Sequence, residues 1–277
     1  MNREVVVVIG TGGIGQAIAR RQGAGKSLLL ADFNQETLSS AAQALKAAGH
    51  AVTTQPVDVS SRESVNSLAN AAAKLGDVVQ IVHTAGLSPV QASPAAILAV
   101  DLVGVAIVLE EFGRIVAQGG AGVVISSMAG YMFPPLDRGQ EEALARTPAD
   151  DLLYLPFLAP EVVSDSGSAY GMAKRANRVS VQAAAVTWGE RDARINSISP
   201  GIILTPLAEE EMAGAGGPNY RRMIETSAAG RVGTSDEVAS LAAFLLGPEA
   251  AFITGSDVLM DGGVIAALRA GRWTPQS

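Results

Sequence analysis

The stretch "EVVVVIGTGGIGQAIAR", residues 4–20, decides the fold because it joins a β-branched run to a glycine-rich turn and then to a helical pattern. Gly10, Gly12 and Gly15 have the G-x-G-x-x-G spacing. Glycines at these positions permit a tight turn and close approach of the backbone to a pyrophosphate, which the helix N-terminus stabilises. Glycine-rich turns also occur wherever a strand simply meets a helix, so the motif depends on its context. We predict a dinucleotide site built from Gly10, Thr11, Gly12, Gly13, Ile14 and Gly15.

An acidic residue supplies that context. The second β-branched run, residues 27–32, ends in Asp32. A carboxylate at this place accepts hydrogen bonds from the adenosine ribose and repels a 2′-phosphate, so the sequence favours NAD over NADP. The alternative is that Asp32 caps a helix at the strand end. Asp58 and Val59, at the end of the third run, are predicted to flank the adenine ring; Asp58 can also cap a helix that starts near Ser60, and the two roles do not exclude each other.

Short apolar runs alternate with Ala-rich amphipathic segments through the first half of the chain. Such continuous apolar strands suit a parallel sheet covered on both faces, and right-handed crossovers then give a doubly wound architecture. We therefore predict a Rossmann-like α/β fold of about seven strands in a single domain, residues 1–277. The expected strands span residues 4–10, 27–32, 51–59, 78–86, 122–127, 193–199 and 255–263.

The alternation breaks after the fifth run. Residues 131–167 contain five prolines and several acidic residues, with a short helical pattern over 139–146, and a long helix is expected to resume near Ser168. We interpret this segment as an insertion in the domain. Its apolar stretches, "YMFPPL" and "LLYLPFLAP", are predicted either to form a lid over the nicotinamide or to cover an interface and pack the insertion down. After the sixth strand a mobile, Gly-rich crossover is expected.

Composition excludes several classes of function. The formal net charge is −7 and there is no long basic run, so nucleic acid is not expected as a partner. There is no cysteine, and the two histidines lack ligand spacing, so no metal site is expected. The apolar run at 95–109 carries Asp101 and is too short to span a bilayer, and residues 1–10 lack the apolar length of a signal peptide. The expectation is a cytoplasmic protein that does not enter the membrane.

A tyrosine and a lysine stand four residues apart in "SGSAYGMAKRANR", residues 166–178. On a helix Tyr170 and Lys174 share one face, and an ammonium beside a phenol favours the phenolate, which suits general acid and base chemistry. Such a pair is also common as surface packing. Ser127 favours the functional interpretation, because it ends the fifth run at the sheet edge where doubly wound folds bind ligands. We expect its hydroxyl to contact a substrate oxygen.

In their order and separation, "VIGTGGIG", "ADFN", "ISSMAG", "YGMAK" and "SISPGIILTPL" resemble the short-chain dehydrogenase/reductase family over essentially the whole chain. The resemblance implies hydride transfer between a nicotinamide and an alcohol or carbonyl carbon. It implies that Tyr170 is the catalytic acid and base, that Lys174 lowers its pKa and binds the nicotinamide ribose, and that Ser127 orients the substrate oxygen. It further implies cofactor contacts from Tyr170 as well as from Ala85, Gly86, Pro200, Gly201, Ile203 and Thr205.

Three features depart from the family pattern. The glycine turn between Gly10 and Gly13 is one residue shorter than usual. The sequence "HTAG", residues 83–86, replaces the usual Asn-Asn-Ala-Gly, and His83 is expected to pack beside the sheet. Asp101 stands at the position of a catalytic asparagine. It either preserves a relay water through its backbone carbonyl or, if its side chain matters, alters the proton path near Lys174.

The long insertion and the C-terminal pattern at 247–269 resemble the bacterial 3α-hydroxysteroid dehydrogenase/carbonyl reductase branch, which implies a hydrophobic ketone or secondary alcohol as substrate. We predict an NAD-dependent alcohol/ketone oxidoreductase. One alternative is a dinucleotide-binding regulator with the same fold and little turnover. An epimerase or dehydratase is the other, and the chain after Ser199 leaves little room for its substrate domain. The helix expected over 95–112 is apolar on nearly every side, which indicates a homo-oligomer. The family resemblance also implies an oligomer, a dimer or tetramer.

Overall fold

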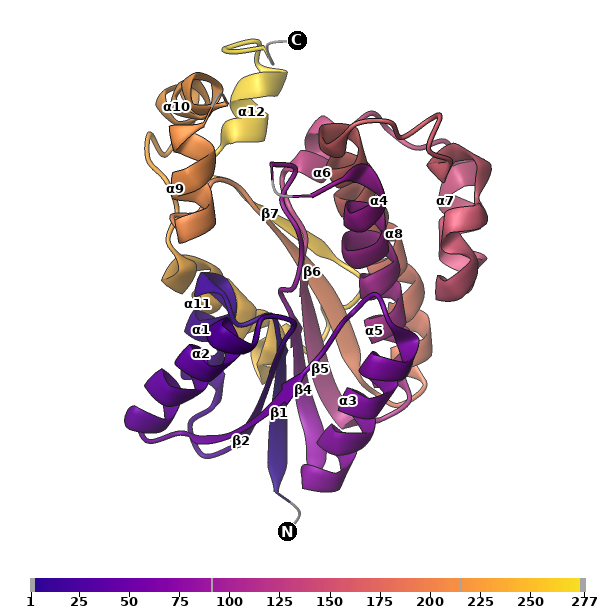
Figure 1. Cartoon of the computed structure of the whole chain (residues 1–277), viewed down its shortest axis with the longest axis vertical. Coiled ribbons are helices and arrows are strands. Elements are labelled where there is room, and N and C mark those ends of the chain that lie inside the picture. Colours follow the sequence, from indigo (N-terminus) through magenta and orange to yellow (C-terminus); the bar gives the residue numbers. More distant parts are fainter. Residues whose placement is uncertain (1–2, 91, 215, 275–277) are drawn as a thin grey trace.

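A seven-stranded parallel sheet forms the centre of the protein, with the strand order β3-β2-β1-β4-β5-β6-β7. The computed structural model describes residues 3–90, 92–214 and 216–274. Helices α1, α2 and α11 cover one face of the sheet, and α3, α5 and α8 cover the other (Figure 1). The predicted doubly wound, Rossmann-like α/β fold is therefore confirmed. The strands are β1 (Glu4–Ile9), β2 (Ser27–Asp32), β3 (Ala51–Pro56), β4 (Asp77–His83), β5 (Val116–Ile125), β6 (Arg194–Pro200) and β7 (Asp257–Met260).

Most helices connect consecutive strands, and several more follow β5 and β6. The α-helices are α1 (Gly13–Gln22), α2 (Gln35–Ala47), α3 (Arg62–Leu75), α4 (Pro94–Ile97), α5 (Val105–Gly113), α6 (Ala129–Met132), α7 (Arg138–Arg146), α8 (Ser166–Gly189), α9 (Pro206–Ala213), α10 (Gly217–Thr226), α11 (Ser235–Leu246) and α12 (Val264–Arg269). A π-helix, η1 (Leu98–Gly104), joins α4 to α5, and the 3-10 helices are η2 (Ala149–Tyr154), η3 (Pro156–Leu158) and η4 (Pro248–Ala250).

The apolar run of β1 is explained by its central position. It pairs with β2 on one side and with β4 on the other, so neither edge is open. Val5, Val7 and Ile9 point into the core beneath α3, α5 and α8, whereas Val6 and Val8 point into the core beneath α1, α2 and α11. Alternate side chains of a strand face opposite sides, so a strand covered on both faces has to be apolar at every position.

Several of the sequence-based boundaries need correction. The fourth strand ends at His83 instead of residue 86, and the fifth spans Val116–Ile125 instead of residues 122–127. The third strand ends at Pro56, so Asp58 and Val59 lie in the loop that follows it. The segment after β6, expected as a mobile Gly-rich crossover, connects β6 to β7 and contains the helices α9 and α10. Pro206 begins α9 and Pro218 stands in the first turn of α10, where the missing amide hydrogen of proline carries no penalty.

The insertion, residues 131–167, packs against the layer formed by α5 and α8. Leu144, Leu152 and Leu158 are buried in the core that these helices share with the sheet. An ion-pair cluster joins the insertion to the same surface: the Arg62 guanidinium lies 2.7 Å from Asp150 and 2.6 Å from Glu110. The insertion thus packs against a surface to which α5 contributes, and Glu110 of α5 accepts a hydrogen bond from the amide of Ala149.

Candidate active site

The glycine turn leaves room for a ligand at one position only. Gly10 has a φ of +93°, a left-handed conformation that favours glycine, and a Cβ on Gly15 would lie 1.9 Å from the carbonyl oxygen of Gly10. These two glycines therefore serve the turn itself. Gly12, in contrast, is the N-cap of α1 without a side-chain cap, and a Cβ added there would meet nothing within 4 Å. The space beside Gly12 is therefore open, and the first amides of a helix lack intrahelical partners, a combination that fits a bound phosphate group.

Thr84 holds the glycine turn against the end of β4. Its hydroxyl donates a 2.8 Å hydrogen bond to the carbonyl oxygen of Gly10, and the amide of Ala85 donates to Ile9. A Cβ on Gly10 would collide with both Thr84 and Ala85. In the sequence Thr84 stands out only as a departure from the family pattern, and this contact was not predicted. A hydroxyl residue directly after an apolar strand was the available signal.

Asp32 and the glycine turn form one unit. A single carboxylate oxygen of Asp32 accepts hydrogen bonds from the backbone amide of Thr11, at 2.6 Å, and from its hydroxyl, at 2.9 Å. The other oxygen accepts from the amide of Asn34, and it is Asn34, not Asp32, that caps α2. The alternative of Asp32 as a helix cap is therefore wrong. The carboxylate is fixed at the carboxyl end of β2, close to the turn.

The two residues predicted beside the adenine ring differ in exposure. Asp58 accepts hydrogen bonds from the amide and hydroxyl of Ser60 and is half-buried, whereas the cap of α3 is Ser61. Val59 is buried in the core, where a Cβ on Gly104 would touch its side chain. Only the backbone of Val59 is therefore available for a ligand.

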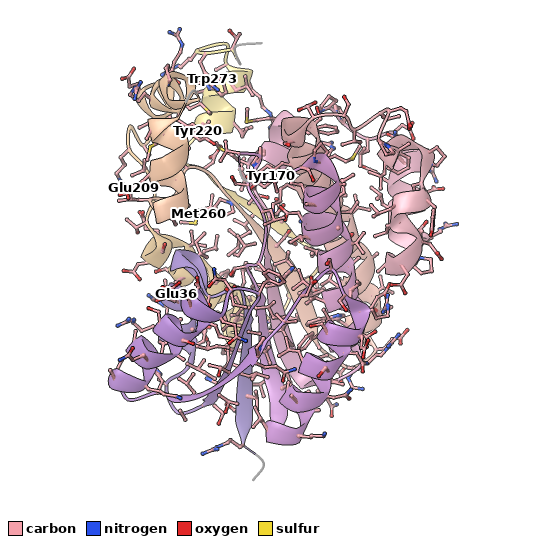
Figure 2. All side chains as sticks on the ribbon, viewed as in Figure 1. Glu36, Tyr170, Glu209, Tyr220, Met260 and Trp273 are labelled. Atoms are coloured by element: carbon pink, nitrogen blue, oxygen red, sulfur yellow. The ribbon has the colours of Figure 1, made fainter. Side chains whose placement is uncertain are left out.

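Tyr170 and Lys174 lie on α8, whose start is fixed by Asp165, which accepts a hydrogen bond from the amide of Ser168. The Lys174 ammonium lies 5.2 Å from the centre of the Tyr170 ring. Lys174 is only 4% exposed, so the alternative of a surface packing pair is wrong. Figure 2 shows Tyr170 at the same end of the sheet as Met260 of β7, with Tyr220 and Trp273 on the segments above.

Asp101 and His83 complete the buried surroundings of Lys174. The Asp101 carboxylate lies 3.2 Å from the ammonium. Burial raises the pKa of Asp101, although the ammonium and the amide of Leu87 oppose this rise. Burial by itself would lower the pKa of Lys174, but Asp101 and Tyr170 outweigh it, so that pKa is raised. His83, the last residue of β4, is buried, and burial together with Lys174 lowers its pKa to about 3, so its ring is neutral.

Ser127 lies two residues past β5, on the same edge of the sheet. Its hydroxyl oxygen accepts a 3.2 Å hydrogen bond from the amide of Ala129, which leaves the hydroxyl hydrogen for another acceptor. The neighbouring Ser126 donates to the carbonyl oxygen of Lys174 at 2.8 Å and so ties the end of β5 to α8. This bond brings Ser127 to the helix that carries Tyr170.

The segment after β6 closes the site from the other side. The amide of Met128 donates to Pro200, and the amide of Gly201 donates to Met260. Ile203 is buried and pairs with Gly233. The methyl group of Thr205 lies 3.3 Å from where a Cβ on Gly13 would be. The structure thus brings the predicted residues of the glycine turn, of the ends of β2, β4 and β5, of α8 and of this segment to one edge of the sheet.

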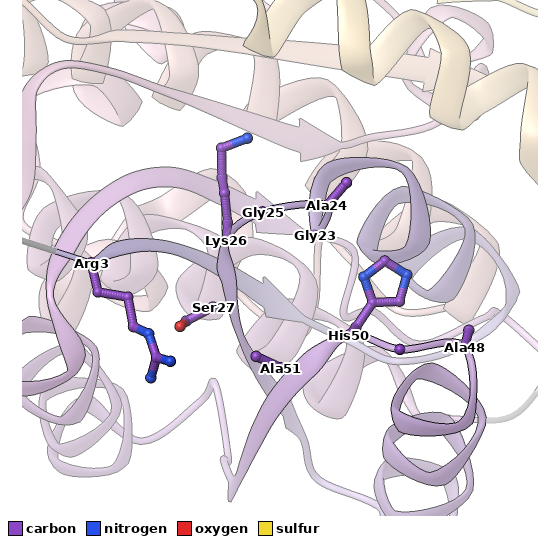
Figure 3. Close-up of a pocket in the computed structure, with 10 residues that line it drawn as sticks. Arg3, Gly23, Ala24, Gly25, Lys26, Ser27, Ala48, His50 and Ala51 are labelled. Atoms are coloured by element: carbon purple, nitrogen blue, oxygen red, sulfur yellow. The ribbon is translucent and has the colours of Figure 1, made fainter.

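A hollow of about 390 Å³ lies at the opposite edge, where β1, β2 and β3 begin (Figure 3). Arg3, Lys26 and His50 line it, but in Figure 3 the Lys26 and Arg3 side chains point in different directions. The C-termini of α1 and α2 are close by, and basic side chains stabilise helix C-termini. This hollow is separate from the site described above.

Comparisons with known proteins identify the family. Residues 4–136 match the family profile "short chain dehydrogenase", and residues 141–265 match "Enoyl-(Acyl carrier protein) reductase". A short-chain dehydrogenase/reductase of Alternaria brassicicola, bsc3, is 47% identical over 97% of this chain and 98% of its own. The 3-alpha-hydroxysteroid dehydrogenase/carbonyl reductase of Comamonas testosteroni is 29% identical over 81% of this chain and 91% of its own. A short-chain type dehydrogenase/reductase structure from Mycobacterium ulcerans, 26% identical, superposes with a TM-score of 0.74 over 95% of this chain and 90% of that one.

The fold is the doubly wound α/β fold that many dinucleotide-binding proteins share. The chain belongs to the short-chain dehydrogenase/reductase family, and it is an oxidoreductase enzyme. The family binds a nicotinamide dinucleotide, either NAD or NADP, and acts on small molecules. Across the part of the chain that the structure describes, no helix is both long enough and apolar enough to cross a membrane.

Proposed function

We propose that this protein is an NAD-dependent oxidoreductase that interconverts a ketone and a secondary alcohol, with Tyr170 as the acid and base. The observation that carries the proposal is the burial of the Lys174 ammonium beside the Tyr170 phenol, at the edge of the sheet that holds the glycine turn. Packing alone does not require a buried ammonium, because desolvating it is costly. A regulatory protein with little turnover is the less favoured alternative, because it would not need a desolvated ammonium beside the phenol.

Each polar residue has a distinct task in this mechanism. A nicotinamide dinucleotide, when bound, supplies or accepts the hydride. The glycine turn and the start of α1 would hold its pyrophosphate, Asp32 its adenosine ribose, and Lys174 its nicotinamide ribose. Asp58, Ala85, Gly86, Pro200, Gly201, Ile203 and Thr205, with the backbone of Val59, would line the rest of the cofactor. Ser127 donates a hydrogen bond to the substrate oxygen, and Tyr170 exchanges a proton with that oxygen.

The test is a steady-state assay of the purified protein with NADH and NADPH and a panel of cyclic ketones and secondary alcohols. The proposal expects turnover with NADH on apolar ketones. Tight NADH binding without turnover on any substrate would instead support the regulatory alternative.

Asp32 should control the choice between NADH and NADPH. Asp32→Ser removes the negative charge that repels a 2′-phosphate. It also removes the carboxylate that accepts hydrogen bonds from the ribose, and hydrogen bonds to charged groups are worth about 1.5–3 kcal/mol. We expect the ratio of kcat/KM for NADH to that for NADPH to fall by about tenfold or more. Glu36→Gln is the matched control, because it removes an exposed negative charge from the first turn of α2 (Figure 2). An equal change in both variants, or a wild type that prefers NADPH, contradicts the proposal.

Apolar residues beside Ser127 favour a hydrophobic substrate. Met128 is buried in a cluster with Ile202, Met223 and Trp273, and Tyr131 and Met132 of α6 pack against it. Methionine side chains adapt to irregular apolar shapes, which suits a bulky carbonyl compound. A steroid has no special support, since the Comamonas testosteroni enzyme is a distant relative. We infer a single domain in which the insertion supports α5 and α8. Within it, α6, where the insertion begins, lines the part of the site that takes the substrate. The insertion as a whole does not form a lid.

We also infer a homo-oligomer and a cytoplasmic location. Because the insertion packs against α5, the interface would lie elsewhere, and Val186 on α8 and Phe252 after η4 are large apolar side chains left exposed. Sedimentation at micromolar concentration should give at least the mass of a dimer. A single species with the 28.3 kDa mass of one chain would refute the oligomer.

A further inference from the structure

The carboxyl group of Asp101 is held in a fully enclosed position. The residue lies in the π-helix η1 and is 0% exposed. One carboxylate oxygen accepts a 2.7 Å hydrogen bond from the amide of Leu87, and the other lies 3.2 Å from the Lys174 ammonium. A Cβ on Gly86 would come within 3.4 Å of both groups, so the glycine lets them meet.

Among the residues that the structure describes, three titratable groups interact electrostatically with Lys174. They are Asp101 from η1, Tyr170 from α8 itself and His83 from β4. His83 is neutral, so it neither compensates nor repels the ammonium with a charge of its own. Burying an ammonium costs free energy, and an ion pair whose carboxylate also accepts a backbone hydrogen bond offsets part of that cost. Asp101 is therefore the counter-charge of Lys174.

This counter-charge acts on the phenol next to it. An ammonium alone, 5.2 Å from the ring centre, would favour the phenolate of Tyr170. A carboxylate in contact with the same ammonium cancels much of that field. With a neutral side chain at position 101, the field of the ammonium on the phenol would be uncompensated. The protonation state of Tyr170 therefore depends on residue 101.

We propose that Asp101 is a positioning residue that neutralises Lys174 and keeps Tyr170 protonated at neutral pH, so that the site is set for carbonyl reduction. The proposal rests on the function proposed above. In that direction the carbonyl carbon gains a hydride from NADH, which becomes NAD⁺, and the carbonyl oxygen takes the phenolic proton of Tyr170. The phenolate then regains a proton from water, which completes the balance.

The first test uses the wild type itself. Tyrosine ionisation is followed by ultraviolet difference absorbance from about pH 6 to 11, and the titration of Tyr170→Phe is subtracted to isolate Tyr170, since an unperturbed tyrosine ionises near pH 10. We expect Tyr170 to contribute no phenolate signal at about pH 7.5. A signal that is complete at that pH overturns the proposal, whatever the other variants do.

The second test compares pH profiles of kcat/KM in both directions for the wild type and Asp101→Asn. Removing the carboxylate should move the profile for alcohol oxidation to lower pH by about one unit or more, which is roughly tenfold faster oxidation at pH 7. Ketone reduction should fall correspondingly at about pH 9. Asp101→Ser, which also removes the charge, should shift the profiles in the same direction, so a local rearrangement around asparagine cannot account for the result.

Glu111 provides the control for the Asp101 variants. Glu111→Gln removes another buried carboxylate, one that pairs with Arg62 away from the site, and should leave the profiles in place. Superimposable profiles for the wild type and both Asp101 variants would overturn the inference while the proposed function stands. If Tyr170→Phe keeps full turnover, the proposed function itself fails, so the two failures are distinguishable.

Discussion

Tyr170→Phe should lower kcat for ketone reduction by about 10²–10⁴-fold, the usual contribution of a positioned acid or base. The substitution removes one oxygen and keeps the ring that packs against the core around α8. Because the glycine turn and Asp32 lie on other elements, the Kd for NADH should change by no more than about threefold. Stopped-flow turnover and fluorescence titration with NADH measure the two quantities on the same sample.

A second tyrosine provides the control for this substitution. Tyr154 lies in the insertion and is 83% exposed, so Tyr154→Phe removes the same hydroxyl group away from the site and should leave kcat unchanged. Full turnover in Tyr170→Phe would remove the proton-transfer role. Loss of NADH binding together with kcat would show a structural defect instead.

Much of the fold was predictable because it is encoded locally. The run Val5 to Val8 has no polar position, which only a strand covered on both faces requires, and the glycine spacing then places a helix directly after it. Ser127 and Asp32 were predictable for the same reason: parallel strands all end at one edge, so residues that follow them converge.

The contacts that define the site were not predictable, because they join distant parts of the chain. Whether Lys174 lies on the surface or in the interior depends on how α8 packs against η1, and the sequence pattern of α8 contains no information on that packing. The hydrogen bond from Thr84 to Gly10 depends on the pairing of β4 with β1. The docking of the insertion through Arg62 and Asp150 joins residues 88 positions apart.

Lys174→Met should destabilise the protein by about 3–5 kcal/mol near neutral pH, because it leaves the Asp101 carboxylate buried without a counter-charge. The loss should depend on pH. Burial raises the pKa of Asp101, and in the variant no ammonium opposes that rise. A group whose pKa is higher in the folded state contributes stability below its unfolded pKa and loses it as the pH rises through the folded value. The deficit relative to the wild type should therefore be small near pH 4 and grow toward pH 8, as measured by urea unfolding.

Removing both charges separates the ion pair from the packing of the two side chains. In Lys174→Met with Asp101→Asn no charge remains to be compensated, so the double variant should be more stable at pH 8 than Lys174→Met alone, and it should lose the pH dependence that the Asp101 carboxylate causes. The double-mutant cycle then gives the coupling between the two residues. A Lys174→Met variant that loses less than about 1 kcal/mol at every pH would mean that Asp101 is already neutral in the wild type. In that case no counter-charge would weaken the effect of Lys174 on Tyr170, and the proposed role of Asp101 would be wrong.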